Sequence, residues 1–388
     1  MIPLSIPVFE GNEEKYVIDA VSQGWVSTGG AYVDTFEKKI ADYTDMPACV
    51  ACQSGTAGLH LALIESGVEK DDLVIAPTLT FIAAVNPIKY VGANPVFMDC
   101  DDSLCIDPIK LKDFCEKECD FVDEKLIHNK SGKKISAIIV VHVFGNFADM
   151  ESVMNIAHKY NLKVIEDATE AIGTVCNYGK YKGRMAGTIG DFGVYSFNGN
   201  KIITTGGGGA IVSNNINALK HLKYMSTQCK DDSLFYIHNE IGFNYRMTNV
   251  QAAIGVAQME ELDLFIERKN NNYDLYFEQL KNNKNGYLLP FRSNISSNKW
   301  FYSFVLNKEN CKKSIKEYIL KLQDFEIQTR PIWGLVNEQK PYIDDISYKI
   351  ERAYFYKERV INLPCSTNLN QEQIKKVCNT LNKINEVK

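Results

Sequence analysis

The sequence of 388 residues lacks long hydrophobic runs, dense basic blocks, internal repeats and low-complexity tracts. A membrane-spanning helix needs about 20 consecutive apolar residues, so insertion into a membrane is excluded. Without a Lys/Arg block that could follow a phosphate backbone, nucleic acid is not the main partner. The segment Met1–Phe9 lacks the basic flank and the length of a secretion signal. With 45% hydrophobic residues, the chain is neither disordered nor collagen-like.

Paired cysteine and histidine motifs of a metal site are also missing, although the chain contains 11 cysteines. An odd number of scattered cysteines in a long chain indicates free thiols in a reducing cytosol, so we expect a cytoplasmic protein. Cys49 and Cys52 have C-x-x-C spacing, but no second pair accompanies them. We interpret Ala48–Cys52 as a buried strand of small residues and expect no metal site.

Short apolar runs alternate with longer amphipathic segments from about Ala48 onward. This alternation predicts βαβ units, and therefore an α/β fold with a mainly parallel central sheet. The predicted strands are Cys49–Cys52, Leu73–Ala76, Pro95–Met98, Ala137–His142, Val164–Asp167 and Val194–Phe197. The predicted helices between them are Gly55–Ser66, Phe81–Tyr90 and Asp149–Tyr160.

The length predicts about two domains, at roughly 150 residues each. A polar excursion over Lys117–Lys134 is expected to form a hairpin, and a long helix over Asn249–Arg268 leads out of the sheet. We place the boundary there, with a large domain over residues 1–268 and a smaller α+β domain over 269–388. The second domain is expected to contain a strand over Trp300–Leu306 and helices over Cys311–Leu322 and Gln371–Ile384.

Chemically informative residues follow three of the predicted strands. Ser54 and the glycines after it open a helix whose free amides could hold an anion. Asp167 ends an apolar strand, where a carboxylate either caps the helix that follows or meets a cationic partner. Lys201 lies in a turn directly after another buried strand, where a desolvated amine can form a Schiff base. An anion seat, a carboxylate and an amine are together what pyridoxal phosphate (PLP) requires.

The chain resembles the fold-type-I PLP enzymes of the nucleotide-sugar aminotransferase family (DegT/StrS type) from about Ile6 to Leu369. The motifs that carry this resemblance are Gly24–Gly30, Ser54–Ala57, Pro77–Phe81, His142–Gly145, Glu166–Ala168, Ser196–Lys201, Thr204–Gly206 and Gly242–Met247. The stretch Asn198–Lys201, its glycine run and the insertion before Val140 further resemble the branch of the legionaminic-acid pathway. The resemblance implies an aspartate-aminotransferase-like large domain.

The resemblance also implies roles for individual residues. Lys201 would hold the cofactor covalently and then move the proton, and Asp167 would keep the pyridine nitrogen protonated. The other implied cofactor-binding residues are Gly55, Thr56 and Ser196 at the phosphate, Phe81 stacked on the ring, Glu170, and Asn244 from a second subunit. The implied substrate-binding residues are Trp25, Thr28, Gly29 and Arg330, with His142 either near the ring or satisfying a backbone group.

Two positions depart from the pattern of the family. Glu170 stands where the family more often has an amide or imidazole that donates a hydrogen bond towards the phenolic oxygen of the cofactor. A carboxyl group donates only when protonated, so either the pKa of Glu170 is raised or this contact differs. Gly207 replaces the usual acidic residue, which removes a charge and adds backbone freedom.

The expected function is that of a cytoplasmic homodimer with active sites shared between subunits. It would move an amino group from glutamate to C4 of a UDP-linked 4-keto-6-deoxy-N-acetylhexosamine, for surface-glycan or nonulosonic-acid biosynthesis. The alternatives are a GDP- or dTDP-linked keto sugar aminated at C3 or C4, or a non-catalytic homologue. The presence of both Lys201 and Asp167 disfavours a non-catalytic homologue. Lys201 also disfavours a deoxygenating dehydratase of the same fold, which would be expected to have His at that position.

Overall fold

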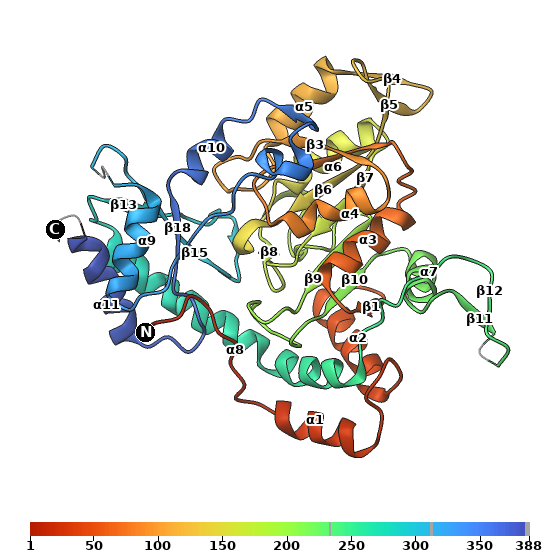
Figure 1. The fold of residues 1–388 in the computed structure, drawn as a ribbon, viewed down its shortest axis with the longest axis horizontal. Coiled ribbons are helices and arrows are strands. Elements are labelled where there is room, and N and C mark those ends of the chain that lie inside the picture. The colour runs from red at the N-terminus through yellow and green to blue at the C-terminus, as the bar shows by residue number, and fades with distance from the viewer. Residues whose placement is uncertain (233, 311–312, 385–388) are drawn as a thin grey trace.

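The computed structural model describes residues 1–232, 234–310 and 313–384, and its core is a ten-stranded mixed sheet (Figure 1). The strands run in the order β1 (Cys49–Cys52), β10 (Gly209–Val212), β9 (Phe192–Ser196), β7 (Lys163–Asp167), β6 (Lys134–Val141), β2 (Leu73–Pro77), β3 (Asn94–Met98) and β17 (Ile346–Tyr348). The hairpin of β4 (Cys119–Val122) and β5 (Lys125–His128) pairs with β6. The α/β fold, the six predicted strands and the hairpin are thereby confirmed.

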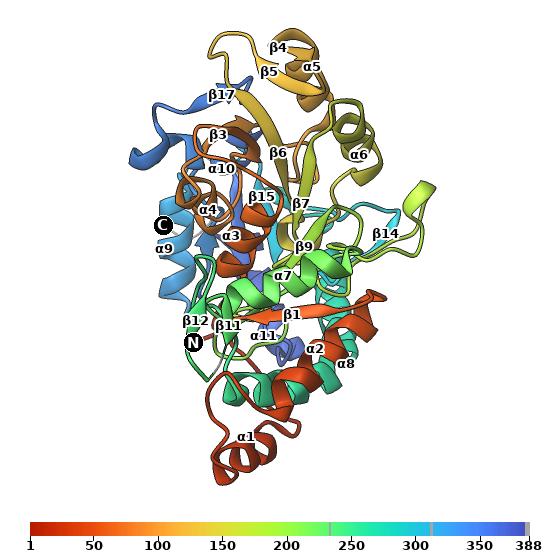
Figure 2. The same ribbon diagram turned by 90° about the vertical axis from the view of Figure 1, so that its right-hand side faces the viewer.

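Helices cover this sheet on both sides, with α3 and α4 on one side and α6 on the other (Figure 2). The helices of this part of the chain are α1 (Glu13–Ser22), α2 (Ala31–Thr44), α3 (Gly55–Glu65), α4 (Asn86–Tyr90), α5 (Pro108–Lys117), α6 (Met150–Lys159), α7 (Ile216–Ser226) and α8 (Asn249–Leu280). Single 3₁₀ turns occur at Ile82–Ala84, Val143–Gly145, Gly179–Tyr181, Val336–Glu338 and Lys340–Tyr342. Parallel strands covered in this way are apolar along their whole length, as in β2.

The prediction of one helix over Phe81–Tyr90 is wrong, because a 3₁₀ turn ends at Ala84 and α4 begins only at Asn86. Pro87 lies in the first turn of α4, where its missing N–H costs nothing but where it prevents continuation from the preceding turn. Phe81 therefore precedes the helical region in an extended conformation.

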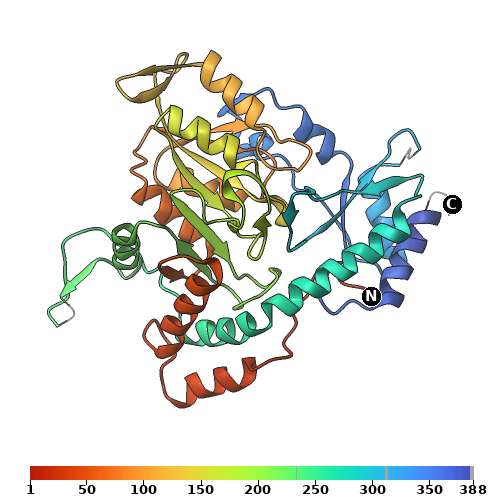
Figure 3. The same ribbon diagram turned by 180° about the vertical axis from the view of Figure 1, so that it is seen from behind.

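Helix α8 extends beyond the predicted end at Arg268 and reaches Leu280 (Figure 3). The asparagines at 270 and 272 have low helix propensity, but their side-chain amides donate hydrogen bonds to the carbonyl groups of Ser297 and Ser366. Tertiary contacts thus overcome local preference. The proposed boundary at residue 268 falls inside this helix, and the division into 1–268 and 269–388 stays a prediction.

The C-terminal part forms a second, antiparallel sheet of four strands beside the far half of α8. Its strands are β13 (Gly286–Leu288), β15 (Tyr302–Leu306), β18 (Val360–Leu363) and β16 (Arg330–Pro331), and its helices are α9 (Ile315–Asp324), α10 (Arg352–Lys357) and α11 (Gln371–Lys383). The first residues of the helix predicted from Cys311 lie outside the described residues.

Two small ribbons complete the fold. One pairs β8 (Val175–Cys176) with β14 (Ile295–Ser296) and so joins the two parts of the chain. The other pairs β11 (Lys230–Asp232) with β12 (Ile237–His238) and projects from the body of the molecule (Figure 1). Among the described residues, no helix has the length and apolarity needed to cross a membrane, and no three His, Cys, Asp or Glu side chains are placed to hold a metal ion.

Candidate active site

A cavity of about 350 Å³ lies at the carboxyl ends of β1, β7 and β9. Strands β7 and β9 are parallel. Strand β1 points the same way as β9, because β1 and β9 both pair antiparallel with β10. The three predicted strand ends therefore open on one edge of the sheet. Of the predicted cofactor residues, those that line the cavity are Gly55, Thr56, Phe81, Asp167, Glu170, Ser196 and Lys201.

One wall of the cavity is the first turn of α3. The Ser54 side chain caps this helix by accepting the backbone N–H of Ala57 at 3.1 Å. The N–H groups of Gly55 and Thr56 have no acceptor within the helix and lie at its positive end. A Cβ at Gly55 would come within 3.0 Å of Ser196 Cβ, so glycine keeps this seat open. The arrangement fits a phosphate group.

Asp167, at the end of β7, supplies a carboxylate to the cavity. This side chain is only 4% exposed, and its Oδ1 accepts the backbone N–H of Thr169 at 3.1 Å. Burial raises the pKa of Asp167, while Thr169 and the positive charge of Lys201 oppose the rise. Asp167 forms no salt bridge within the described part of the chain. A buried carboxylate of this kind fits a protonated ring nitrogen.

Lys201 extends into the cavity from the turn after β9. Its Nζ lies 3.7 Å from Glu170 Oε1 and 4.2 Å from the centre of the Trp300 ring. The other Glu170 oxygen accepts the backbone N–H of Phe144 at 2.8 Å. Burial raises the pKa of Glu170 to about 7, against the opposing effects of Lys201 and the Phe144 N–H. Of the two alternatives for Glu170, the structure thus supports the raised pKa.

His142 does not line the cavity. Its ring is fully buried, and Nδ1 accepts the backbone N–H of Ala148 at 3.2 Å, so Nε2 carries the proton and donates to Glu166 at 2.8 Å. Of the two readings left open for this residue, satisfaction of a backbone group is the one that the structure favours. Both ring nitrogens have partners within the chain, and a role of His142 as a substrate contact stays a prediction.

Glu166 is the buried anchor that sequence patterns did not reveal. Its carboxylate accepts the backbone N–H groups of Gly187, Ile189 and Gly190 at 2.9, 2.6 and 2.6 Å, in addition to His142. Burial opposes ionisation, but these hydrogen bonds lower the pKa of Glu166. The carboxylate therefore fixes the end of β7 immediately before Asp167.

Five other predicted residues lie on the surface, outside the cavity: Trp25, Thr28, Gly29, Asn244 and Arg330. The loop around Trp25 is held by Asn249, whose side chain donates to the Trp25 carbonyl group at 2.6 Å. Within a single chain the structure does not bring these residues to Lys201. Their roles at the sugar nucleotide or in a neighbouring subunit stay predictions.

The C-terminal part supplies an aromatic wall that sequence reasoning missed. Trp300, Phe301 and Trp333 line the cavity opposite the sheet, and the Trp300 indole N–H donates to the Asn200 carbonyl group at 2.9 Å. The one sequence feature that could have indicated this wall is the rarity of tryptophan: the chain has only 3, and two of them line the cavity.

The glycine run after Thr205 is held by hydrogen bonds at Gly207. Gly207 lines the cavity, but its carbonyl group accepts hydrogen bonds from Thr205 Oγ1 and Gln251 Nε2, both at 2.6 Å. The left-handed conformation occurs at Gly206, with φ of 77°. The freedom expected at Gly207 is therefore limited by these two contacts.

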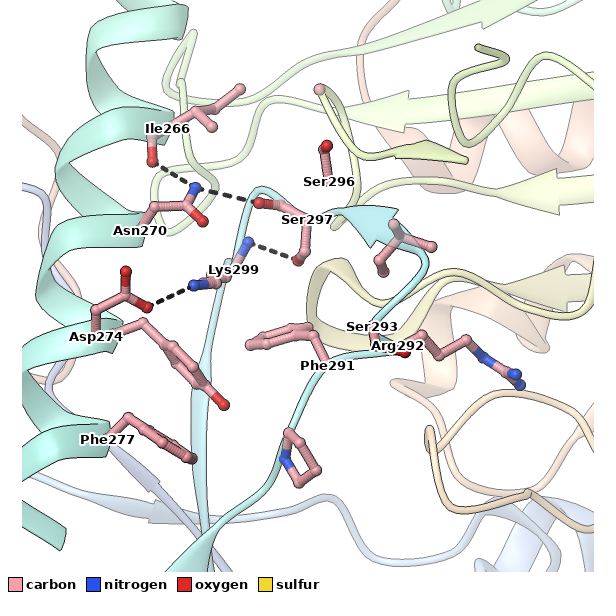
Figure 4. A pocket seen from close by; sticks show the side chains of 14 residues that line it. Ile266, Asn270, Asp274, Phe277, Phe291, Arg292, Ser293, Ser296, Ser297 and Lys299 are labelled. Carbon is pink, nitrogen blue, oxygen red and sulfur yellow. Dashed lines mark hydrogen bonds and ion pairs between the residues drawn. The ribbon is translucent and has the colours of Figure 1, made fainter. Parts of the chain in front are cut away.

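A larger cavity, of about 570 Å³, lies between α8 and the segment around Ser297 (Figure 4). Aromatic side chains of Tyr273, Phe277 and Phe291 line it, and Lys299 is paired with Asp274 at 2.9 Å. None of the predicted site residues lies there. Size alone therefore does not identify the active site.

The residues around the smaller cavity fit PLP. Gly55, Thr56 and Ser196 would hold its phosphate, Asp167 its ring nitrogen and Lys201 its aldehyde carbon. When bound, this cofactor supplies an electron sink for the carbon that gains or loses an amino group.

Comparison with known proteins agrees with this geometry. Residues 8–382 match the DegT/DnrJ/EryC1/StrS aminotransferase family. The GDP-perosamine synthase of Escherichia coli O157:H7 is 35% identical over 386 residues, which cover 98% of each chain. The UDP-4-amino-4,6-dideoxy-N-acetyl-beta-L-altrosamine transaminase of Campylobacter jejuni is 28% identical over 382 residues, with 95% of each chain covered.

Solved structures share the fold. The aminotransferase TlmJ of Streptoalloteichus hindustanus superposes with a TM-score of 0.87 at 22% identity and covers 98% of both chains. Helicobacter pylori PseC, an aminotransferase involved in the biosynthesis of pseudoaminic acid, gives a TM-score of 0.86 at 22% identity over 99% of both. Family, fold and site agree: the chain belongs to the DegT/DnrJ/EryC1/StrS aminotransferase family and is a PLP-dependent sugar aminotransferase.

Proposed function

We propose that the protein transfers an amino group from glutamate to the C4 ketone of a GDP-linked keto sugar. The observation that carries an aminotransferase reaction is the convergence of Lys201, Asp167 and the Gly55 seat on one cavity. The nucleotide is proposed from the comparisons, because the relative with 35% identity is named for a GDP-linked product.

A UDP-linked 4-keto-6-deoxy-N-acetylhexosamine, the substrate first expected from the sequence, is the second candidate. The Campylobacter jejuni relative, whose name contains a UDP-linked sugar, supports it at 28% identity. The proposed place in the legionaminic-acid branch depends on this candidate. Because the cofactor residues are the same in both cases, Lys201 and Asp167 do not distinguish them.

The side chains of the cavity have separate tasks in this reaction. Lys201 is the base that moves a proton to and from the reacting carbon, and Asp167 keeps a positive charge at the ring nitrogen. The wall of Trp300, Phe301 and Trp333 excludes water from one side of the cavity. Glutamate and the keto sugar would use the same cavity in turn, so ping-pong kinetics are expected.

The test is incubation of the PLP-loaded protein with glutamate and a panel of GDP-, UDP- and dTDP-linked 4-keto sugars. Mass spectrometry and NMR then identify the aminated product and the position of the new amine. We expect the GDP-linked sugar to give the highest kcat/KM, and Lys201→Ala to give no product with any of them. A preference for the UDP-linked sugar would select the second candidate, and an amine at C3 would contradict the proposed position.

We also propose a cytoplasmic homodimer with shared active sites. Asn244 is exposed and lies outside the cavity of its own chain, which is compatible with a role in a neighbouring subunit. The projecting hairpin near it exposes Leu234, Phe235 and Tyr236, each more than 70% accessible. The cytoplasmic proposal is supported by the described cysteines, all of which are free and buried.

A further inference from the structure

The amine of Lys201 occupies a defined position between two groups. On one side is Glu170 Oε1 at 3.7 Å, and on the other is the face of the Trp300 ring at 4.2 Å. Lys201 is 13% exposed and Glu170 is 5% exposed, so water screens this pair little. Carboxylate and aromatic face both favour an ammonium group at this point.

Each of the two partners is itself fixed. The second oxygen of Glu170 accepts the Phe144 N–H at 2.8 Å, which leaves Oε1 directed at the amine. The Trp300 indole donates to Asn200 in the turn that also carries Lys201, and the backbone N–H of Trp300 donates to Asn298 Oδ1 at 3.1 Å. The position is therefore built by three separate parts of the chain rather than by a flexible side chain alone.

We propose that Glu170 and the Trp300 ring form the holding position of the Lys201 amine whenever it is not bonded to the cofactor. Glu170 Oε1 at 3.7 Å and the ring centre at 4.2 Å attract the ammonium electrostatically, without a hydrogen bond between the two side chains. The amine is thereby kept inside the cavity, where the reaction needs it.

The charges around Glu170 determine how strongly it holds the amine. The ionisable groups that face it are Lys201 from the turn after β9 and Asp167 from the end of β7. Asp167 opposes a second negative charge, and burial raises the pKa of Glu170 to about 7. The segment after Asn298 presents the uncharged ring of Trp300, and the loop after β6 presents the Phe144 N–H. Once ionised, Glu170 carries the negative charge that the ammonium meets in this poorly screened position.

A second lysine in the same protein provides the matched comparison. Lys299 Nζ lies 2.9 Å from Asp274 and 4.3 Å from the centre of the Tyr273 ring, at the larger cavity (Figure 4). The composition of this pair is the same, a carboxylate and an aromatic face. Asp274, however, is 68% exposed, so water screens its charge.

The test measures the reactivity of both lysines in the cofactor-free protein. Wild type, Glu170→Gln and Asp274→Asn are labelled with acetic anhydride between pH 6 and 11, and mass spectrometry quantifies each lysine. The amide of Gln keeps an acceptor for Phe144 and loses the charge. An opposite charge within about 4–6 Å favours the charged form of an amine, so the labelling of Lys201 at a given pH should increase about tenfold or more in Glu170→Gln. Asp274→Asn should leave the labelling of Lys201 unchanged and increase that of Lys299 by less than about threefold.

Unchanged labelling of Lys201 in folded Glu170→Gln would overturn the proposal. If that variant does not fold, Trp300→Phe decides, because it leaves the carboxylate in place, weakens the aromatic contact and removes the indole hydrogen bond to Asn200. A smaller increase in labelling is expected there, and no increase would again contradict the holding position. In the PLP-loaded protein, the pH dependence of the visible absorbance should change in Glu170→Gln and stay as in wild type in Asp274→Asn.

Discussion

Two adjacent carboxylates, Glu166 and Asp167, should respond in opposite ways to the same substitution. Glu166 accepts four hydrogen bonds, and the NH₂ group of a glutamine would face two of these donors whichever way it turned. Removing one partner from a buried, paired charge costs about 3–5 kcal/mol. We therefore expect Glu166→Gln to lower the Tm of the cofactor-free protein by at least about 5 °C.

Asp167→Asn should leave the fold intact. Its hydrogen bond from Thr169 can be kept by the amide oxygen, and the other oxygen of the carboxylate faces the cavity without a salt bridge in the described chain. Replacing a buried, unpaired carboxylate by a neutral amide removes a desolvation penalty. The Tm of the cofactor-free variant should therefore equal or exceed that of wild type.

In contrast to its small effect on Tm, Asp167→Asn should strongly reduce activity. Loss of a buried charge pair with the ring nitrogen costs about 3–5 kcal/mol, which corresponds to a fall in kcat of about 10²- to 10⁴-fold. Differential scanning calorimetry without cofactor and turnover with saturating PLP separate the two effects. An Asp167→Asn variant with kcat within threefold of wild type, or one as unstable as Glu166→Gln, would refute the reasoning.

Three further results are expected. Burial raises the pKa of Glu170 from 4.5 to about 7, so the cofactor-free protein loses stability as the pH rises through this range. Urea titrations should show that the free energy of unfolding of Glu170→Gln, relative to wild type, increases by about 3 kcal/mol between the lower and the upper end of this range. A difference between the two proteins that does not change with pH would contradict this. Gly55→Ala should raise the Kd for PLP at least about tenfold, measured by absorbance, because of contacts at 3.0 Å, whereas Gly199→Ala, whose Cβ meets no atom within 4 Å, should not. If sites are shared, mixing inactive Lys201→Ala with Asn244→Ala should restore about a quarter of wild-type activity, and no recovery would argue against sharing.

The sequence was sufficient for the parts of the site that are local in the chain. Each of Gly55, Asp167, Ser196 and Lys201 follows or ends an apolar run, and parallel strands bring their carboxyl ends to one edge. The strand pattern therefore predicted both the sheet and the convergence of these residues. The family resemblance added their roles.

Other features depend on contacts between distant segments and left no local pattern. Trp300 and Trp333 belong to the C-terminal part. They are about 100 or more residues from Lys201 in the sequence, and only tertiary folding brings them to the same cavity. The hydrogen-bond partner of His142 is Glu166, which adjoins Asp167, the carboxylate that the sequence singled out. The sequence pattern therefore could not show that both nitrogens of the His142 ring already have partners within the chain. Likewise, the asparagines of α8 are helical because remote carbonyl groups accept their hydrogen bonds.

The central claim is that Lys201, opposite Asp167, is the lysine that bonds to PLP. Reduction of the PLP-loaded protein with sodium borohydride fixes the cofactor to its lysine, and peptide mass spectrometry then locates it. The account predicts the added mass on the peptide that contains Lys201, and its absence in Lys201→Ala. Attachment to Lys299 or to any other lysine, or no attachment in the wild-type protein, would contradict it.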